Sequence, residues 1–426
     1  MLRKLKIKFK SQFYENVLKL SMVIGNPRFT ASVLAIITGR IKRGSEYTAL
    51  VLGRTIFYDD IDAMARFSRK LNYAIIHLSY WEIIFSHFTD PAERKMLTET
   101  NYYSSDYCRK GKENYYRYLK QMFPYLKWSL KIDAIISGNI GYVVQQELAK
   151  VCGEQGVPFI ALHKEAMDVY GGRLESYSDF KFIGARILFY NNRIREEALK
   201  RIAGLSEGNT AVVGIPRFDS YFRDQRKPNH KQVVFFCFYP KDKFLAIIRD
   251  EQKLARAKQA YADFHKLMID FAAEHPDFRV IMKTKNAQYY MDYVLGILRA
   301  SHQTQPSNLV ITKSGKASDL ILSSSAVIGF DSTALIEAVA ADRPVICPDF
   351  RDFVSSQSWN FFAGFEGLVN YVKIKQDLDK FLLGPMLQTD QTKPTRNTFL
   401  ERLIGPPDGN ASIRAESAIL ETIKNY

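Results

Sequence analysis

Short apolar runs alternate with amphipathic segments along most of the chain. Each apolar run is bounded by glycine, proline or polar residues and has the length of a buried strand, whereas the segments between them place apolar residues at helical spacing. The runs that predict strands lie at residues 47–54, 73–80, 133–139, 157–165, 185–191, 232–240, 278–286, 309–315, 325–330 and 343–348. Strands that alternate with helices are typical of parallel sheets, so the pattern predicts an α/β fold.

The series of strands and helices is interrupted by a polar stretch with a proline, RDQRKPNHK, at residues 223–231. A chain of 426 residues is longer than one hydrophobic core usually serves, so two domains are expected. We predict an N-terminal domain at 1–225 that opens with a basic segment and a C-terminal domain at 231–400. A tail with a terminal helix is expected at 401–426.

The most informative stretch is Leu320–Phe350, in which an apolar run is followed by a polar turn, a helical segment and a second apolar run. Asp331, Ser332 or Thr333 can cap the helix, whose N-terminal N–H groups and dipole suit a phosphate. Glu337 lies about 6 Å further along the axis, at 1.5 Å per residue, where its carboxylate could reach a sugar hydroxyl of the same ligand. The alternative is an ordinary capped helix packed on a sheet.

This stretch carries the pattern S-S-x-x-x-x-F-D-S-T-A-x-x-E-A-x-A-x-x-x-P-V-I and resembles the nucleotide-binding segment of GT-B glycosyltransferases that build bacterial surface polysaccharides. Sialyl- and Kdo-type transferases and polyol-phosphate transferases of the CDP-glycerol kind have related segments. The G-x-P-R-F-D step from Gly214 to Asp219 also resembles these transferases. The resemblance implies that Ser332 and Thr333 bind the donor phosphate and that Glu337 binds ribose.

The same resemblance implies a GT-B architecture, in which two Rossmann-like domains face each other across a cleft. The acceptor would bind the N-terminal half and the nucleotide-activated donor the C-terminal half.

Three more residues that are candidates for binding the donor follow two other predicted strands of the C-terminal domain. Tyr239 stands at the end of one strand, and Lys283 and Lys285 stand at the end of the next. Two cationic side chains on one side of an extended segment, beside a phosphate turn, suit a diphosphate or the phosphate of CMP. Lysines at strand ends are, alternatively, often only solvated.

The candidate catalytic residues also follow predicted strands. One strand of the N-terminal domain ends in His163, Lys164 and Glu165, a triplet that resembles one in surface-polysaccharide transferases. Carboxyl ends of parallel strands line the ligand crevice, so Glu165 is a candidate acid or base toward an acceptor hydroxyl. Asp242 is a candidate nucleophile for double displacement. The alternatives are a loop-holding ion pair for Glu165, a core position for His163 and a loop cap for Asp242.

The charge balance favours anionic partners. The chain has 60 Lys and Arg against 45 Asp and Glu, a formal charge of +15. No zinc-finger spacing or RNP-like motif is present, so we do not expect a nucleic-acid partner. No D-x-D element stands at a strand end and no H-E-x-x-H is present, so we expect a reaction without metal or cofactor, in which lysines and helix dipoles stabilise the leaving phosphate.

The first twenty residues are basic and amphipathic, with no acid before Glu15. The basic residues that alternate with apolar ones are Arg3, Lys4, Lys6, Lys8 and Lys10. Such a segment can lie on an anionic membrane surface, and the alternative is a solvated helix packed on its own domain by one face. No apolar run reaches membrane-spanning length and the 4 cysteines form no C-x-x-C pair, so we predict a cytoplasmic protein that can associate with the inner face of the bacterial inner membrane.

Together these features predict a glycosyltransferase that transfers a sugar from a nucleotide-activated donor to a glycan or lipid-linked glycan of the bacterial surface, such as lipopolysaccharide O-antigen or capsule. CMP-Kdo is the first candidate donor. One alternative is a CDP-polyol phosphotransferase, for which a histidine base such as His163 would be central. The other is a non-catalytic scaffold of the same fold at the membrane surface.

Overall fold

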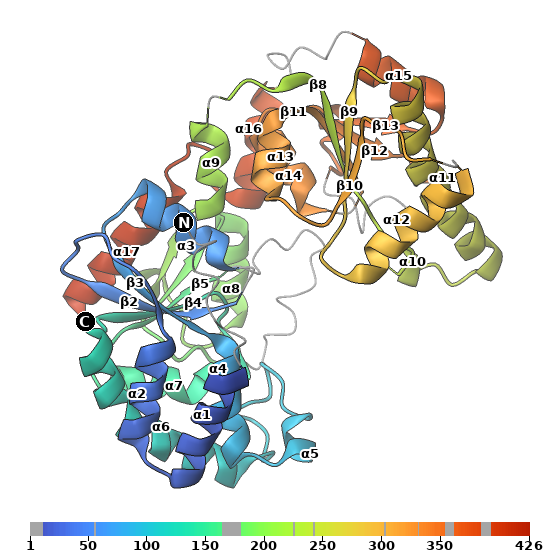
Figure 1. Cartoon of the computed structure of the whole chain (residues 1–426). Helices are drawn as coiled ribbons and strands as arrows, with labels where there is room; N and C mark the ends of the chain where they lie inside the picture. The colour runs from blue at the N-terminus through green and yellow to red at the C-terminus, as the bar shows by residue number, and fades with distance from the viewer. Residues whose placement is uncertain are drawn as a thin grey trace. The chain divides into compact units, whose positions relative to one another are not determined.

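The computed structural model describes residues 12–54, 57–163, 180–224, 226–241, 243–301, 304–330, 332–353, 362–384 and 393–426 (Figure 1). The chain divides into two compact units. The first unit comprises Met1–Asp219 and Arg402–Tyr426, and the second comprises Ser220–Glu401. The chain passes from one unit to the other within two helices, α9 (Asp219–Arg223) and α16 (Lys393–Ile404).

The first unit is built on a seven-stranded sheet of order β1-β3-β2-β4-β5-β6-β7. Every pairing in it is parallel except that of β1 with β3. The strands are β1 (Gly39–Ile41), β2 (Thr48–Gly53), β3 (Asn72–His77), β4 (Ala134–Ser137), β5 (Phe159–Leu162), β6 (Arg186–Phe189) and β7 (Thr210–Val212). The central strands are apolar almost throughout, because helices cover both faces of a parallel sheet.

Nine helices belong wholly to the described part of the first unit. They are α1 (Gln12–Ile24), α2 (Pro27–Ile37), α3 (Tyr58–Phe67), α4 (Leu78–Phe88), α5 (Pro91–Arg94), α6 (Arg109–Leu130), α7 (Gln146–Glu154), α8 (Asn192–Arg201) and α17 (Ala411–Asn425). Buried hydroxyls join the first two helices to α6. Thr30 Oγ1 lies 2.9 Å from Ser21 Oγ and 2.5 Å from the hydroxyl of Tyr118.

The last helix of the chain, α17, is fixed to the first unit by a buried carboxylate. Asp219 accepts the backbone N–H groups of Ala411 at 2.9 Å and Ser412 at 2.7 Å, which are otherwise without acceptors at a helix start. Gly214 has a φ of +82° and packs against Ala411, where a Cβ would come within 3.0 Å of that side chain. The first and last residues of the G-x-P-R-F-D step, Gly214 and Asp219, therefore contact the start of the C-terminal helix.

The second unit is built on a six-stranded sheet of order β10-β9-β8-β11-β12-β13, and all its pairings are parallel. The strands are β8 (Asn229–Phe236), β9 (Arg279–Lys283), β10 (Leu309–Thr312), β11 (Ser324–Gly329), β12 (Val345–Pro348) and β13 (Val369–Val372). Counted from β8, this order is 3-2-1-4-5-6, that of nucleotide-binding Rossmann sheets.

Helices connect these strands and cover the sheet. They are α10 (Lys243–Ala246), α11 (Glu251–Glu274), α12 (Gln288–Ser301), α13 (Ala317–Ser323), α14 (Thr333–Ala340) and α15 (Lys375–Leu383). Asp250 caps α11, the longest of these, by accepting the N–H of Lys253 at 2.6 Å.

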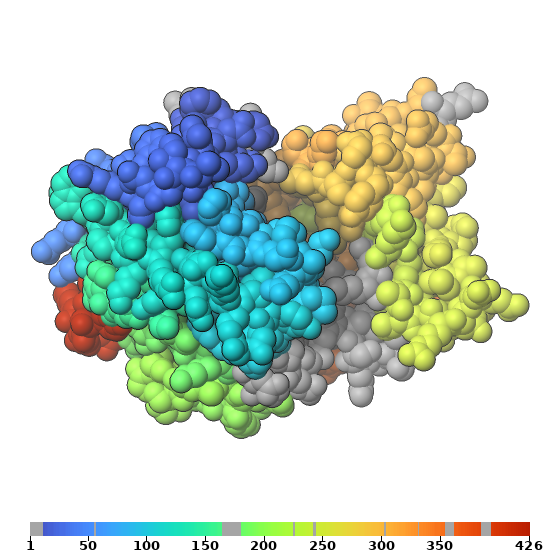
Figure 2. Space-filling model, turned by 90° about the horizontal axis from the view of Figure 1, so that it is seen from below, coloured from blue at the N-terminus to red at the C-terminus, as the bar shows by residue number. Residues whose placement is uncertain are grey.

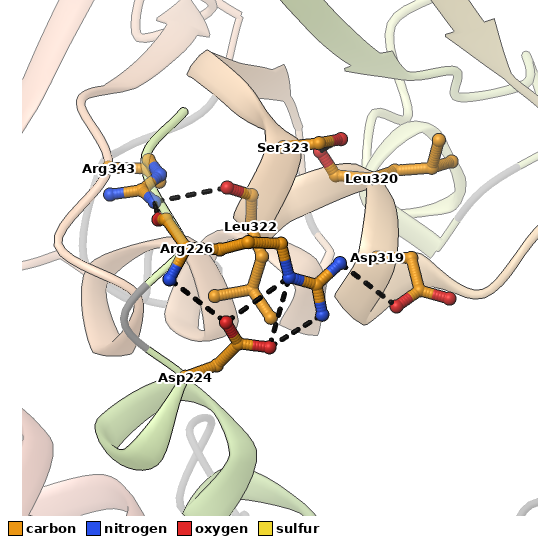
Figure 3. A network of polar contacts seen from close by, with 7 residues as sticks. All are labelled: Asp224, Arg226, Asp319, Leu320, Leu322, Ser323 and Arg343. Atoms are coloured by element: carbon orange, nitrogen blue, oxygen red, sulfur yellow. Dashed lines mark hydrogen bonds and ion pairs between the residues drawn. The ribbon is translucent and has the colours of Figure 1, made fainter. Parts of the chain in front are cut away.

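Arg226, in the predicted linker, forms ion pairs and a hydrogen bond at the amino edge of the second sheet (Figure 3). Arg226 binds the carboxylates of Asp224, at 2.5 Å, and Asp319, at 3.5 Å. The guanidinium of Arg343, which precedes β12, donates to the carbonyl oxygen of Arg226 at 3.3 Å. The first strand accordingly starts at Asn229, earlier than the sequence pattern predicts.

His265 is buried in the aromatic core of the second unit. Its ring packs against Phe235 and Phe238, with centroids 4.8 and 4.6 Å away. Its Nδ1–H donates to the carbonyl oxygen of Tyr261 at 2.7 Å, because a carbonyl can only accept. Burial lowers the pKa of His265 from 6.5 to about 4, so the folded protein holds the ring neutral.

We expect Asp219→Ala to lower the free energy of unfolding by about 2 kcal/mol, because two N–H groups at the start of α17 lose their acceptor in a buried place. Urea denaturation followed by circular dichroism measures this. Asp219→Asn keeps one acceptor oxygen and should lose about half as much. A stability of the alanine variant within about 0.5 kcal/mol of wild type would contradict the capping role.

We expect the buried His265 to make the fold acid-sensitive. Between pH 6.5 and about 4 the unfolded chain binds a proton at this ring and the folded chain does not, so stability is present above pH 6.5 and falls below it. The loss amounts to about 3 kcal/mol across that range. His265→Gln should reduce the slope of unfolding free energy against pH in this range by up to about 1.4 kcal/mol per pH unit, the value for a difference of one bound proton.

Candidate functional site

Most of the residues predicted to bind the donor lie at the carboxyl edge of the second sheet. The strand order reverses between β8 and β11, and ligands of such sheets bind outside the carboxyl ends of the strands at that point. Tyr239 follows β8, Lys283 ends β9, and Ser332 follows β11. Because β9, β8 and β11 are consecutive neighbours in the sheet, residues from three separate parts of the sequence end at one edge.

Ser332, one of three candidate caps in the sequence, caps the helix at this edge. Its backbone is extended, and its Oγ accepts the N–H of Ala334 at 3.3 Å. The buried face of α14 holds the helix against the sheet, so its positive end is directed at the carboxyl edge. Thr333, the first helical residue, is exposed there.

Glu337 stands one turn into the same helix and is held in place by a tyrosine. Its Oε2 accepts the hydroxyl of Tyr221, from α9, at 2.5 Å. A carboxylate has several acceptor sites, so a Glu337 oriented in this way can still accept from a sugar hydroxyl. The sequence analysis did not identify Tyr221, whose only signal is its place two residues after the G-x-P-R-F-D step.

The two predicted lysines have different surroundings. The ammonium of Lys283 donates to the backbone carbonyls of Thr284, at 2.8 Å, and Lys313, at 3.0 Å. Burial lowers the pKa of Lys283. An ammonium has three donors, so these two bonds leave one for an anion. Lys285 Nζ lies 5.2 Å above the ring of Tyr290, a cation–π contact.

Tyr239 belongs to a cluster of four tyrosines at the same edge. Its ring centroid lies 4.9 Å from that of Tyr289, 5.2 Å from that of Tyr290 and 5.3 Å from that of Tyr293. The side chain of Tyr289 is 53% exposed. Aromatic faces in such a cluster can stack on a planar or sugar ring. The segment QYYMDYV carries this signal, which the sequence analysis missed.

The structure places only one of the three predicted catalytic residues. Glu165 and Asp242 lie outside the described residues, as does Asp331. His163 follows β5 in the first unit and is buried, with its ring 5.9 Å from that of Phe189 in an edge-on contact. The backbone N–H of His163 donates to the backbone carbonyl oxygen of Leu188 at 2.9 Å.

A polar loop that the sequence analysis missed follows β4, where the strand order of the first sheet reverses. Asn139 is fully buried, and its Oδ1 accepts the N–H of Gly141 at 2.7 Å. Gln145 donates to the carbonyl oxygen of Asn139, also at 2.7 Å. No described residue accepts a hydrogen bond from Asn139 Nδ2. The sequence pattern places Asn139 only at the end of a predicted strand.

Among the described residues, no three His, Cys, Asp or Glu side chains come together as a metal ligand set. No helix in the described parts of the chain is both long and apolar enough to cross a membrane. Metal independence remains a prediction for experiment.

No family model and no curated protein sequence matches the chain. Solved structures do match it. The UDP-GlcNAc 2-epimerase of Methanocaldococcus jannaschii has a TM-score of 0.51 at 13% identity, over 88% of this chain and 99% of that one. A Listeria monocytogenes protein assigned as a UDP-N-acetylglucosamine 2-epimerase has a TM-score of 0.50 at 12% identity, over 90% of this chain and 98% of that one.

At such low identity these similarities show the fold alone. The matched structures have the GT-B fold, and the match extends over most of both chains. Together with the two parallel sheets, this confirms the predicted fold class: two Rossmann-like domains of the GT-B type.

Proposed function

We propose that this protein is a glycosyltransferase that binds a nucleotide-activated sugar at the carboxyl edge of the second sheet. The observation that carries the proposal is the position of α14, whose Ser332-capped end follows the strand at the point where the strand order reverses. Ser332 and Thr333 would bind the donor phosphate at the positive helix end, and Glu337 would bind ribose. The bond from Tyr221 supports this because it orients the carboxylate before any ligand arrives.

The neighbouring side chains suit the rest of such a donor. Lys283 and Lys285 would neutralise the phosphate that leaves, in place of a metal ion. Tyr239 and its exposed neighbour Tyr289 would stack on a ring of the donor. All four side chains follow or flank the ends of β8 and β9, which pair directly with each other.

The catalytic roles stay as the sequence predicts them. Glu165 would act as acid or base toward a hydroxyl of a glycan or lipid-linked glycan acceptor, and Asp242 would be the nucleophile if configuration is retained. His163 would be the base if the protein is instead a CDP-polyol phosphotransferase. The first candidate donor remains CMP-Kdo.

A second candidate is epimerisation of a UDP-sugar. The observation that favours it is that the two solved structures described above, with TM-scores of 0.51 and 0.50, both carry the name UDP-GlcNAc 2-epimerase. UDP-sugars therefore have to be tested beside CMP-sugars. The two functions differ in their requirement for an acceptor, since an epimerase changes its substrate without one.

We expect one nucleotide among CMP, CDP, UDP, GDP and ADP to raise the Tm of the purified protein, with and without Mg²⁺. Ligand at one hundred times its Kd stabilises the native state by about 2.7 kcal/mol, so a shift of a few degrees should be measurable by differential scanning fluorimetry. A shift with CMP would support the Kdo- or sialyl-type donor, and a shift with UDP would direct the assay to UDP-sugars. No shift with any of the five would refute the nucleotide site and leave the scaffold alternative.

Product analysis then separates the two reactions. The nucleotide-sugar that contains the stabilising nucleotide is incubated with the protein, alone and with a glycan acceptor. Release of the nucleotide only in the presence of acceptor supports the transferase, and inversion at a sugar carbon without acceptor supports the epimerase.

We expect Glu337→Gln to raise the Kd of the stabilising nucleotide at least tenfold, because a hydrogen bond to a charged group contributes about 1.5–3 kcal/mol. Tyr221→Phe removes only the group that orients Glu337 and should raise the Kd about threefold. Isothermal titration calorimetry measures both. The matched control is Glu401→Gln at an exposed position of α16. An unchanged Kd in the Glu337 variant would remove this residue from the site.

A further inference from the structure

One surface of the first unit concentrates exposed apolar side chains. Of the sixteen large hydrophobic side chains that are exposed among the described residues, six lie on α1 and α2. They are Phe13, Leu20, Val23, Ile24, Phe29 and Ile36. Figure 2 shows this segment, in blue, on the outside of the molecule. We name the surface formed by α1, α2 and the outer side of α6 the α1–α2–α6 surface.

The exposed residues of α1 are not those that attach it to the unit. The helix buries Leu18 and Met22, whereas Leu20, Val23 and Ile24 on other sides are 55%, 76% and 57% exposed. A helix that is apolar around most of its circumference is normally buried on all sides. The outer side of α1 is therefore suited to contact an apolar medium or partner that the described residues do not supply.

The neighbouring helix α6 adds aromatic side chains to the same surface. α2 packs on α6, and Arg28 of α2 lies 5.6 Å above the ring of Tyr125. Tyr125 is 44% exposed, and Trp128, one turn further, is 83% exposed. Tyrosine and tryptophan prefer the boundary between water and lipid, where the ring is partly buried and its polar atom hydrated.

The charge of this part of the chain selects the kind of partner. Residues 1–40 contain eight basic residues and one acid, Glu15, a net charge of +7 out of +15 for the whole chain. The basic residues are Arg3, Lys4, Lys6, Lys8, Lys10, Lys19, Arg28 and Arg40. A second copy of the chain would bring the same positive charge to the contact and be repelled, whereas anionic lipid headgroups would be attracted.

We propose that the α1–α2–α6 surface docks on an anionic lipid bilayer. Leu20, Val23 and Ile24 of α1, and Trp128 of α6, would enter the boundary between headgroups and acyl chains, and Lys19 and Arg28 would bind lipid phosphates. The inference extends the contact expected from residues 1–20 to α2 and α6. It does not depend on the proposed function, because the ligand is the lipid surface itself.

The test is co-sedimentation of the full chain with sucrose-loaded vesicles of phosphatidylcholine alone or with 30% phosphatidylglycerol. We expect at least tenfold stronger partitioning onto the anionic vesicles, and a loss of binding as NaCl is raised from 0.05 to 0.5 M. Absence of binding to the anionic vesicles would overturn the proposal. Equal, salt-independent binding to both kinds of vesicle would overturn its charge component.

Two sets of variants locate the surface. Leu20→Ser/Val23→Ser/Ile24→Ser and Lys19→Gln/Arg28→Gln alter exposed positions, and each set should lower the partition coefficient at least threefold, the apolar set more. The matched controls in the second unit are Ile247→Ser/Ile374→Ser/Leu383→Ser, at side chains 49–56% exposed, and Arg256→Gln/Lys258→Gln. These controls should bind as wild type does.

The Tm and far-UV circular dichroism of each variant show whether it is folded before its binding is compared. Unchanged partitioning of the folded apolar variant would show that another part of the chain binds the vesicles, which would overturn the assignment. Light scattering tests whether a second copy of the chain covers this surface instead of lipid. A wild-type dimer that the apolar variant converts to a monomer, without vesicle binding by either, would identify a second copy of the chain as the partner and overturn the lipid proposal.

Discussion

Parallel strand pairing in the second sheet is the constraint on which the candidate site depends. Parallel strands need a crossover between each pair, so every strand of the sheet ends at the same edge. Tyr239, Lys283 and Ser332 follow or end three different strands, and that edge is the only place where their side chains can meet one ligand. The strand order reverses between β8 and β11, where α14 begins, and the dipole and first N–H groups of this helix suit a phosphate.

The short helix α9 contributes residues to both units. Its first residue, Asp219, accepts two N–H groups of the last helix of the chain, within the first unit. Two residues later Tyr221 donates to Glu337, within the second unit. The buried carboxylate of Asp219 requires such partners, because an unpaired charge or polar group away from water is costly. The chain thus uses a single turn of helix to fix its C-terminal helix and to orient a residue of the candidate site.

The first unit has a surface on which apolar and basic side chains lie together. Its helices α1 and α2 pack on α4 and α6 and still present apolar residues outward, among basic residues. Apolar area alone favours any hydrophobic contact, and positive charge alone favours any anion. The two properties on one surface together match a bilayer with acidic headgroups, which is also where a lipid-linked acceptor of the proposed reaction would be found.

The sequence by itself determined the alternation of strands and helices and a capped helix start within residues 331–333, because these depend on residues close together in the chain. The edge strands β1, β7 and β13 escaped it, since three or four residues carry too little pattern. Only the tertiary structure decided the strand order, the return of α17 to Asp219 and the meeting of Tyr221 with Glu337, which lie 116 residues apart. It also decided which side of α1 is buried, because apolar residues occur on both the buried side and the exposed side of that helix.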